Sequence, residues 1–191
     1  MSNAIKQAVE AICECHSRRG KILVCGNGGS AADSGHIAGE LMKNFCLHRQ
    51  VPDDDKARLL KIDGGDELAK SLQPGMPVIA LCDQSVLSTA IINDTDPAMI
   101  YAQQVYVYGR PGDIMLGIST SGNAVNVSNA LKVAKAFGLV TIGMTGTKPS
   151  KMNALCDVLI NAPASETYLI QEYHLPIYHT ICLMVEHEAF G

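Results

Sequence analysis

Residues 21–40, KILVCGNGGSAADSGHIAGE, join a short apolar run to a glycine-rich loop and then to a helical pattern. The run 21–25 is typical of a strand buried on both faces, because it is brief, mostly apolar and ends at glycine. Glycine at three of the next four positions permits positive φ and a close approach of the backbone to a ligand. Ser30 is expected to cap the following helix, with Asp33 completing a shortened capping box. The free N–H groups of that first turn favour an anion, so the segment predicts a site for a phosphorylated small molecule.

Two chemistry-bearing side chains follow the loop on one helical face. His36 and Glu40 are four residues apart, so both can reach one ion or one substrate carbon. The loop lacks the G-x-G-x-x-G order and the G-K-[ST] lysine, which disfavours a dinucleotide site and a P-loop. For the glycine loop taken alone, an ordinary tight turn between a strand and a helix is the alternative.

Composition bounds the class of protein. The chain has 191 residues, 47% hydrophobic and 18% charged, which is enough to bury one sizeable core, and we expect a single domain over 1–191. The net charge is −4 and no basic run occurs, so no nucleic-acid partner is expected. No apolar stretch reaches about 18 residues, so no membrane partner is expected either. The seven cysteines are scattered, which favours reduced thiols and a cytoplasmic protein.

Apolar runs alternate with helical patterns along the chain, which predicts an α/β fold. Strands are expected at 21–26, 78–82, 113–119, 140–145 and 158–161. Helices are expected at 3–18, 30–45, 85–92, 97–109, 124–137, 150–155 and 166–189. Right-handed crossovers then give a three-layer sandwich around a doubly wound, five-stranded parallel sheet with flavodoxin-like strand order. Residues 46–76 form a charged insert with short helices at about 53–60 and 65–72.

Three loops with similar chemistry follow strands of this predicted sheet. Besides GNGGS, these are 118–123, with three consecutive hydroxyl residues, and Met144-Thr145-Gly146-Thr147. The carboxyl ends of parallel strands meet at one edge of a sheet, where ligands bind in such folds. One cluster of Ser, Thr and Gly is ordinary turn chemistry, but three at one edge favour a common phosphate ligand.

Four separated segments resemble a known family. CGNGGSAADSGHIAGEL, GISTSGNAVN, TIGMTG and QEYHLPIYH are similar to the sugar isomerase (SIS) domain of phosphoheptose isomerases, and they occur in the same order. The resemblance covers nearly the whole chain. It implies a homotetramer that converts sedoheptulose 7-phosphate into glycero-manno-heptose 7-phosphate through a cis-enediol, with a bound zinc ion and a phosphorylated sugar as partner.

The resemblance also implies roles for individual residues. Glu40 is expected to act as the base and His179 as the acid, and the metal would bind to His36, Glu40, Gln171 and His179. Gln171 and His179 are eight residues apart, about two turns, so they share a face of the last helix. The expected substrate and phosphate ligands are Asn27, Gly28, Gly29, Ser30, Asn93, Asp94, Ser119, Thr120, Ser121, Asn123 and Gln171.

The chain departs from the family pattern at two positions and leaves other functions open. Ala124 stands where the family usually has a serine, and Tyr168 stands where it usually has an aspartate. The alternative function is a non-catalytic SIS protein that senses phosphosugars or binds a replication initiator. The presence of both Glu40 and His179 favours an enzyme, because a binding module has no need for an acid and a base together. For the insert, solvated charge is preferred over an active-site flap or tetramer contact that uses Lys43, His48 or Arg49.

Overall fold

Five parallel strands form one sheet in the order β2-β1-β3-β4-β5. The structure is a computed structural model that describes residues 1–191. The strands are β1 (Ile22–Cys25), β2 (Val78–Ala80), β3 (Ile114–Ile118), β4 (Val140–Thr145) and β5 (Val158–Asn161). Because β1 lies between β2 and β3, the chain winds outward in both directions from the centre, and the predicted flavodoxin-like order is confirmed.

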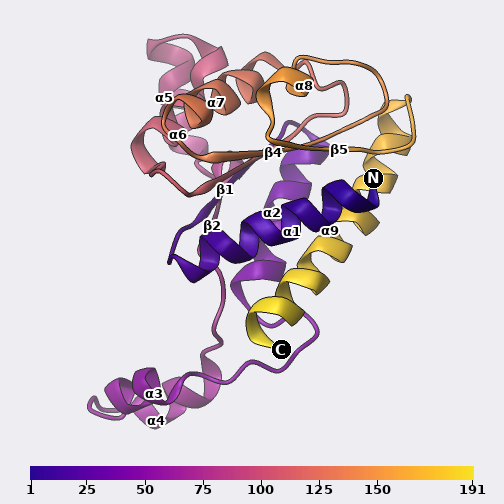
Figure 1. The fold of residues 1–191 in the computed structure, drawn as a ribbon. Helices are drawn as coiled ribbons and strands as arrows, with labels where there is room; N and C mark the ends of the chain where they lie inside the picture. The colour runs from indigo at the N-terminus through magenta and orange to yellow at the C-terminus, as the bar shows by residue number, and fades with distance from the viewer.

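Helices cover both faces of the sheet (Figure 1). One layer contains α1 (Ser2–Ser17), α2 (Gly29–Met42) and α9 (Thr167–Phe190), and the other contains α5 (Ser85–Asp94), α6 (Ala102–Tyr108), α7 (Val125–Ala136) and α8 (Met152–Leu155). Short 3₁₀ turns occur at Leu81–Asp83 and Pro97–Met99. The single helix predicted over 97–109 is therefore wrong, since the chain makes a 3₁₀ turn and then the separate helix α6.

The core is divided in two by the sheet, because successive strand residues point to opposite faces. Ile22, Val24 and Ile114 belong to the cluster that packs under α1, α2 and α9. Leu23 and Met115 belong to the second cluster, with α6 and α7. Burial of every residue in β1 and β3 explains why their sequences are continuous apolar runs without alternation.

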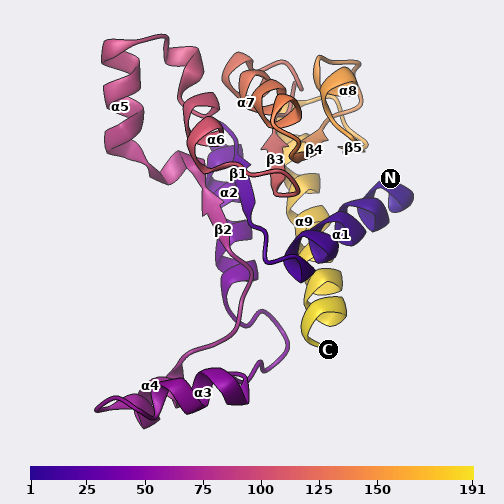
Figure 2. The same cartoon turned by 60° about the vertical axis from the view of Figure 1, so that its left-hand side comes forward.

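The predicted insert is a helical hairpin that projects away from the sheet (Figures 1 and 2). It contains α3 (Asp53–Leu59) and α4 (Gly65–Ser71), and no residue of α3 is buried. At its base, the carboxylate of Glu186 accepts hydrogen bonds from the backbone N–H groups of residues 45–47 at 2.7 to 3.0 Å. Arg49 donates to the same carboxylate at 2.7 Å, and both side chains are almost completely buried. We call this group, Arg49, Glu186 and the N–H groups of 45–47, the Glu186 clamp.

None of the helices is both long and apolar enough to cross a membrane. All seven cysteines are free thiols.

Candidate active site

The start of α2 positions the first group of site residues. Gly28 is the N-cap residue, with a φ of 56°, and the helix begins at Gly29 without a side-chain capping bond. The predicted Ser30 cap is therefore wrong, because the positive φ of Gly28 turns the chain into the helix two residues earlier. Ser30 is instead buried inside the first turn, where its carbonyl oxygen accepts a hydrogen bond from Ser34 Oγ at 2.8 Å.

His36 and Glu40 form the predicted pair on α2. His36 Nε2 lies 3.1 Å from Glu40 Oε1, and the Tyr178 hydroxyl lies 2.8 Å from His36 Nδ1. Burial, reinforced by the charge of Asp33, raises the pKa of the Tyr178 hydroxyl, so it stays protonated and donates to Nδ1. Nε2 then carries the proton that is donated to Glu40, so the two hydrogen bonds of the ring define its orientation. The hydrogen bond from Nε2 orients the carboxylate of Glu40.

His179 faces this pair from α9. Its ring lies 5.0 Å from the His36 ring, between centroids, and the two rings are nearly perpendicular at 86°. Phe45 covers it from another side, with ring centroids 5.7 Å apart. His179 Nε2 is buried and has no hydrogen-bond partner in the chain. A buried polar nitrogen without a partner is unusual in a folded protein and is expected where a ligand or ion binds.

Asp33 is a further polar group at this place that sequence reasoning treated only as part of a cap. Its Oδ2 atom is buried without a partner. Burial raises the pKa of the Asp33 carboxyl, and the nearby His36 and Tyr178 side chains offset part of that rise. Its position three residues before His36, on the same helix face, was a signal that could have identified it.

Gln171 lies two turns before His179 on the same helix. A Cβ added at Gly29 would lie 2.4 Å from Gln171 Nε2, so the amide rests on the first residue of α2 and would have to move if that residue carried a side chain. α9 continues as one helix through Pro176, and the shared face predicted for Gln171 and His179 is found. His174, in contrast, is completely buried and contacts the Thr145 carbonyl at 3.5 Å, so it does not face this site.

The GNGGS loop is tied to the other layer of the sandwich. Asn27 and Asn126 exchange two side-chain hydrogen bonds of 2.9 Å each. Tyr101 donates to the Gly26 carbonyl at 2.6 Å. A Cβ at Gly28 would meet no atom within 4 Å, so the tip of the loop faces open space. These bonds hold the loop in place while its tip is free to contact a ligand.

The hydroxyl-rich loop after β3 lines a polar cleft of about 280 Å³. Thr120, Ser121 and Asn123 contribute from that loop, together with residues that follow β4 and β5 and the first turn of α9. Gly122 has a φ of 63°, and a side chain there would collide with Ser150, so this turn requires glycine. Hydroxyl groups, backbone amides and a helix N-terminus together make a suitable environment for a phosphate.

Sequence reasoning missed three polar residues of this cleft, Lys148, Ser165 and Thr167. Lys148 adds a cation, and Thr167 is the first residue of α9. The signal for Lys148 was its place one residue after the predicted loop 144–147. Ser119 is mostly buried beneath the loop, and its backbone N–H donates to the Met144 carbonyl at 3.0 Å.

Asn93 and Asp94 are not brought to these loops. Both are exposed at the far end of α5, which lies at the outer edge of the molecule (Figure 2), and the Asn93 amide donates to Asp94 at 2.7 Å. Within one chain the structure therefore brings together Asn27, Gly28 and Gly29 with Gln171, and it groups His36 and Glu40 with His179.

The donor set suits zinc, because it combines imidazole, carboxylate and amide groups. The unpartnered Nε2 of His179 fits an ion at this place. The other donors are engaged, since His36 Nε2 is bonded to Glu40 and its Nδ1 to Tyr178. In this arrangement no three His, Cys, Asp or Glu side chains are grouped closely enough to hold a metal ion. Zinc binding therefore requires the His36–Glu40 hydrogen bond to open.

Comparison with known proteins gives one consistent result. The SIS domain model matches residues 1–54 and 63–146. The phosphoheptose isomerase of Maridesulfovibrio salexigens is 42% identical over 170 residues, which cover 89% of this chain and 71% of that protein. The structure of the phosphoheptose isomerase from Neisseria gonorrhoeae aligns with a TM-score of 0.78 at 33% identity, over 97% of this chain and 86% of the other. That from Francisella tularensis aligns with a TM-score of 0.81 at 29% identity, with the same coverage. The chain therefore belongs to the SIS domain family, among the phosphoheptose isomerases.

Proposed function

We propose that this phosphosugar isomerase converts sedoheptulose 7-phosphate into glycero-manno-heptose 7-phosphate through a cis-enediol. The observation that carries the proposal is the meeting of α2 and α9, where a hydrogen-bonded His36–Glu40 pair faces the unpartnered Nε2 of His179. Aldose–ketose isomerisation needs a base beside the substrate carbonyl and an acid for the enediol oxygen. Both groups are present on facing helices.

Glu40 is proposed as the base. His36 donates to one of its oxygens, Oε1, and the other, Oε2, lies 4.0 Å from Lys43 Nζ. The carboxylate is mostly buried, with 15% of its side chain exposed, so it would meet the substrate in a partly dry environment that strengthens its interactions. His179 is proposed as the acid, since its free nitrogen has no competing partner in the protein.

The phosphate is proposed to bind in the cleft lined by Thr120, Ser121 and Asn123. The Lys148 side chain and the N-terminus of α9 add positive charge to the lining of this cleft. Gln171 is on α9 between this cleft and His179, and its amide rests against Gly29. We propose that the Gln171 amide forms hydrogen bonds with the sugar hydroxyls that lie between the phosphate and the reacting carbons. Because Ala124 has no hydroxyl group, the phosphate contacts are assigned to the other side chains that line the cleft.

A zinc ion is part of the proposal, with His36, Glu40, Gln171 and His179 as its ligands. When bound, zinc would polarise the substrate carbonyl. Its test is the zinc content of the purified protein, measured by elemental analysis. We expect His36→Gln and His179→Gln to reduce the bound zinc to a small fraction of the unmodified level, whereas His187→Gln, at an exposed position on the same helix, retains it. Equal zinc content in all three variants would exclude these ligands.

Self-association as a homotetramer and a cytoplasmic location complete the proposal. Large apolar side chains are exposed on α5 and α6, as expected of surfaces that meet another subunit. They include Val86 (82% exposed), Tyr106 (58%) and Val107 (53%). The seven free thiols support a reducing compartment.

The function is tested by an isomerase assay with sedoheptulose 7-phosphate. Glu40→Gln keeps the shape of the side chain but removes the base, and we expect kcat to fall by roughly 10²–10⁴. Glu172→Gln, at an exposed position on α9, is the matched control and should keep full activity. Full activity of Glu40→Gln would exclude the proposed base. A protein that binds the sugar phosphate without turnover would instead be a phosphosugar sensor.

A further inference from the structure

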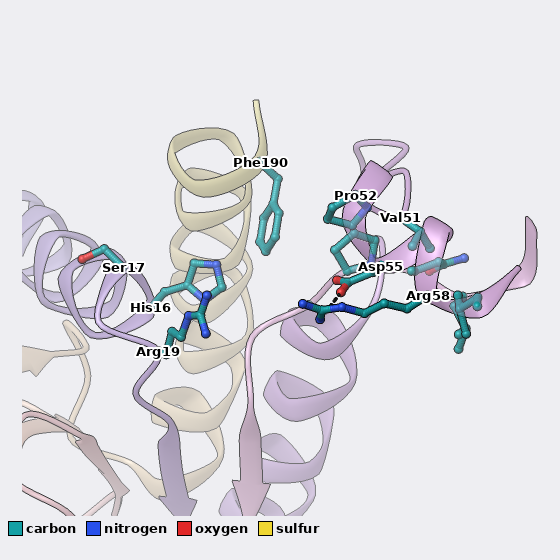
Figure 3. Close-up of a pocket in the computed structure, with 13 residues that line it drawn as sticks. His16, Ser17, Arg19, Val51, Pro52, Asp55, Arg58 and Phe190 are labelled. Atoms are coloured by element: carbon teal, nitrogen blue, oxygen red, sulfur yellow. Dashed lines mark hydrogen bonds and ion pairs between the residues drawn. The ribbon is translucent and has the colours of Figure 1, made fainter. Parts of the chain in front are cut away.

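A second cavity, of about 940 Å³, lies at the base of the insert. It is bounded by the C-terminal end of α1, the last residues of α9 and the hairpin of α3 and α4 (Figure 3). None of the residues assigned above to the phosphate cleft or the His36–Glu40 pair lines it. The volume is within the range of small-molecule sites in proteins, at its upper end.

Cationic side chains enter this cavity from opposite sides. Arg19 and His16 point in from the end of α1, and the guanidinium of Arg58 points toward them from α3 (Figure 3). The side chain of Arg19 makes no hydrogen bond or ion pair within the chain. Arg58 is paired with the carboxylate of Asp55 at 3.0 Å, and that pair is largely exposed, so it contributes little and is readily exchanged. Guanidinium groups pair with phosphate oxygens through two parallel hydrogen bonds, which suits an incoming phosphate.

The remaining wall is apolar and held in place. Phe190 and Pro52 provide flat or rigid apolar surface between the cations (Figure 3). The Phe190 ring lies 5.3 Å from the His16 ring, and the guanidinium carbon of Arg49 lies 4.1 Å from its centroid. Since Arg49 belongs to the buried Glu186 clamp, the Phe190 ring is held in place before any ligand binds. An aromatic face beside the unpaired guanidinium of Arg19 and the exposed, weakly paired guanidinium of Arg58 matches a ligand with a flat ring and a charged phosphate tail.

We propose that this cavity binds a nucleotide, with its base against Phe190 and Pro52 and its phosphates between Arg19 and Arg58. Neither the phosphates nor the base with its sugar can contact both the guanidinium groups and the apolar wall. Inorganic pyrophosphate leaves the apolar wall uncovered, and adenosine leaves the guanidinium groups unpaired. The nucleotide is therefore expected to bind more tightly than either of its halves.

Calorimetric titration of the full-length protein with ADP, pyrophosphate and adenosine tests the proposal. Arg19 has a φ of 58°, a conformation that glycine adopts freely, so Arg19→Gly removes the cation without straining the fold. We expect Arg19→Gly and Arg58→Gln each to weaken ADP binding about tenfold, the loss of one strong phosphate contact. Arg18→Ala is the matched control, because the neighbouring Arg18 pairs with Glu14 outside the cavity, and it should bind ADP as the unmodified protein does.

A spectroscopic readout distinguishes this cavity from the sugar-phosphate cleft. Burial and the charge of Arg49 lower the pKa of His16, and a phosphate bound nearby would raise it. An NMR titration measures this pKa, and the His16 resonance is identified by its loss in His16→Gln. ADP should raise this pKa in the unmodified protein and in Ser121→Ala. Four results would each overturn the proposal: no saturable ADP binding, pyrophosphate binding as tightly as ADP, unchanged affinity in Arg19→Gly and Arg58→Gln, or loss of ADP binding in Ser121→Ala.

Discussion

Two polar clusters lie along α9, and they differ in how completely their hydrogen bonds are satisfied. At the C-terminal end, the Glu186 carboxylate accepts hydrogen bonds from three backbone N–H groups and is paired with Arg49. Two turns earlier, His179 Nε2 is buried with no partner, and Asp33 Oδ2 nearby is in the same state. The first cluster, around Glu186, finds all these hydrogen-bond partners within the chain and is complete, whereas the second, around His179, has buried polar atoms without partners and is incomplete.

This difference is the one expected between a structural role and the proposed catalytic role. A buried charge with all its partners stabilises one conformation, and loss of any partner is strongly destabilising. A buried donor or acceptor without a partner destabilises the free protein, so it persists where function requires it. The two clusters are connected, because the backbone held by Glu186 includes Phe45, whose ring packs on His179. The Glu186 clamp thus holds in place the aromatic ring that covers one side of His179.

The largest expected effect is on activity at the incomplete cluster. His179→Gln removes the proposed acid, and kcat is expected to fall by roughly 10²–10⁴. The melting temperature should change little, because the nitrogen that is lost has no hydrogen bond to lose. Assay and thermal unfolding of the same preparation measure both quantities. His187→Gln is the control, and a large drop in melting temperature with His179→Gln would make His179 a structural residue like Glu186.

The next effect is on stability at the complete cluster. Glu186→Gln leaves the Arg49 guanidinium buried without its counter-charge, and we expect the free energy of unfolding to fall by roughly 3–5 kcal/mol. Urea unfolding measures the loss. Glu188→Gln, two residues away and exposed, is the matched control and should stay within about 0.5 kcal/mol of the unmodified protein. A similarly small loss for Glu186→Gln would remove the distinction between the two clusters.

Much of the fold could be predicted from local pattern. The apolar runs that became β1 and β3, each ending at a glycine or hydroxyl-rich loop, were sufficient to predict a parallel sheet with both faces covered. The 3₁₀ turn at 97–99 was not distinguished from α6, because the hydrogen bond that ties it to α7, from the Asn129 amide to the Ala98 carbonyl, joins residues far apart in the sequence. The exchange of the predicted Ser30 cap for Gly28 has a similar cause, since a positive φ is a property of the folded turn.

The candidate site was predicted in part. The pair His36 and Glu40 could be found because four-residue spacing on a helix forces proximity. Tyr178 was missed as a partner of His36, because the two residues are 142 positions apart in the sequence. The burial of Glu186 could not be predicted, because no local signal shows that Arg49, 137 residues away in the sequence, would pair with it. Long-range pairing of charges is the information that one sequence lacks.

The smallest expected effect is a change with pH in the stability of the complete cluster. Burial alone would raise the pKa of Glu186, but the hydrogen bonds from residues 45–47 and Arg49 outweigh it and hold the pKa at about 2, below its usual 4.5. An acid with a depressed pKa contributes stability that is fully present above about pH 4.5 and is lost as the pH falls toward 2.

Glu186→Gln cannot titrate, so its deficit in unfolding free energy relative to the unmodified protein should narrow by roughly 1 kcal/mol between about pH 7 and about pH 3.5. Urea unfolding at both pH values measures the narrowing. All other carboxylates are common to the two chains, and their contributions cancel in the difference. A deficit that stays constant over this range would mean that Arg49 and the three N–H groups do not stabilise the ionised form of Glu186, and the contrast with His179 would then rest on packing alone.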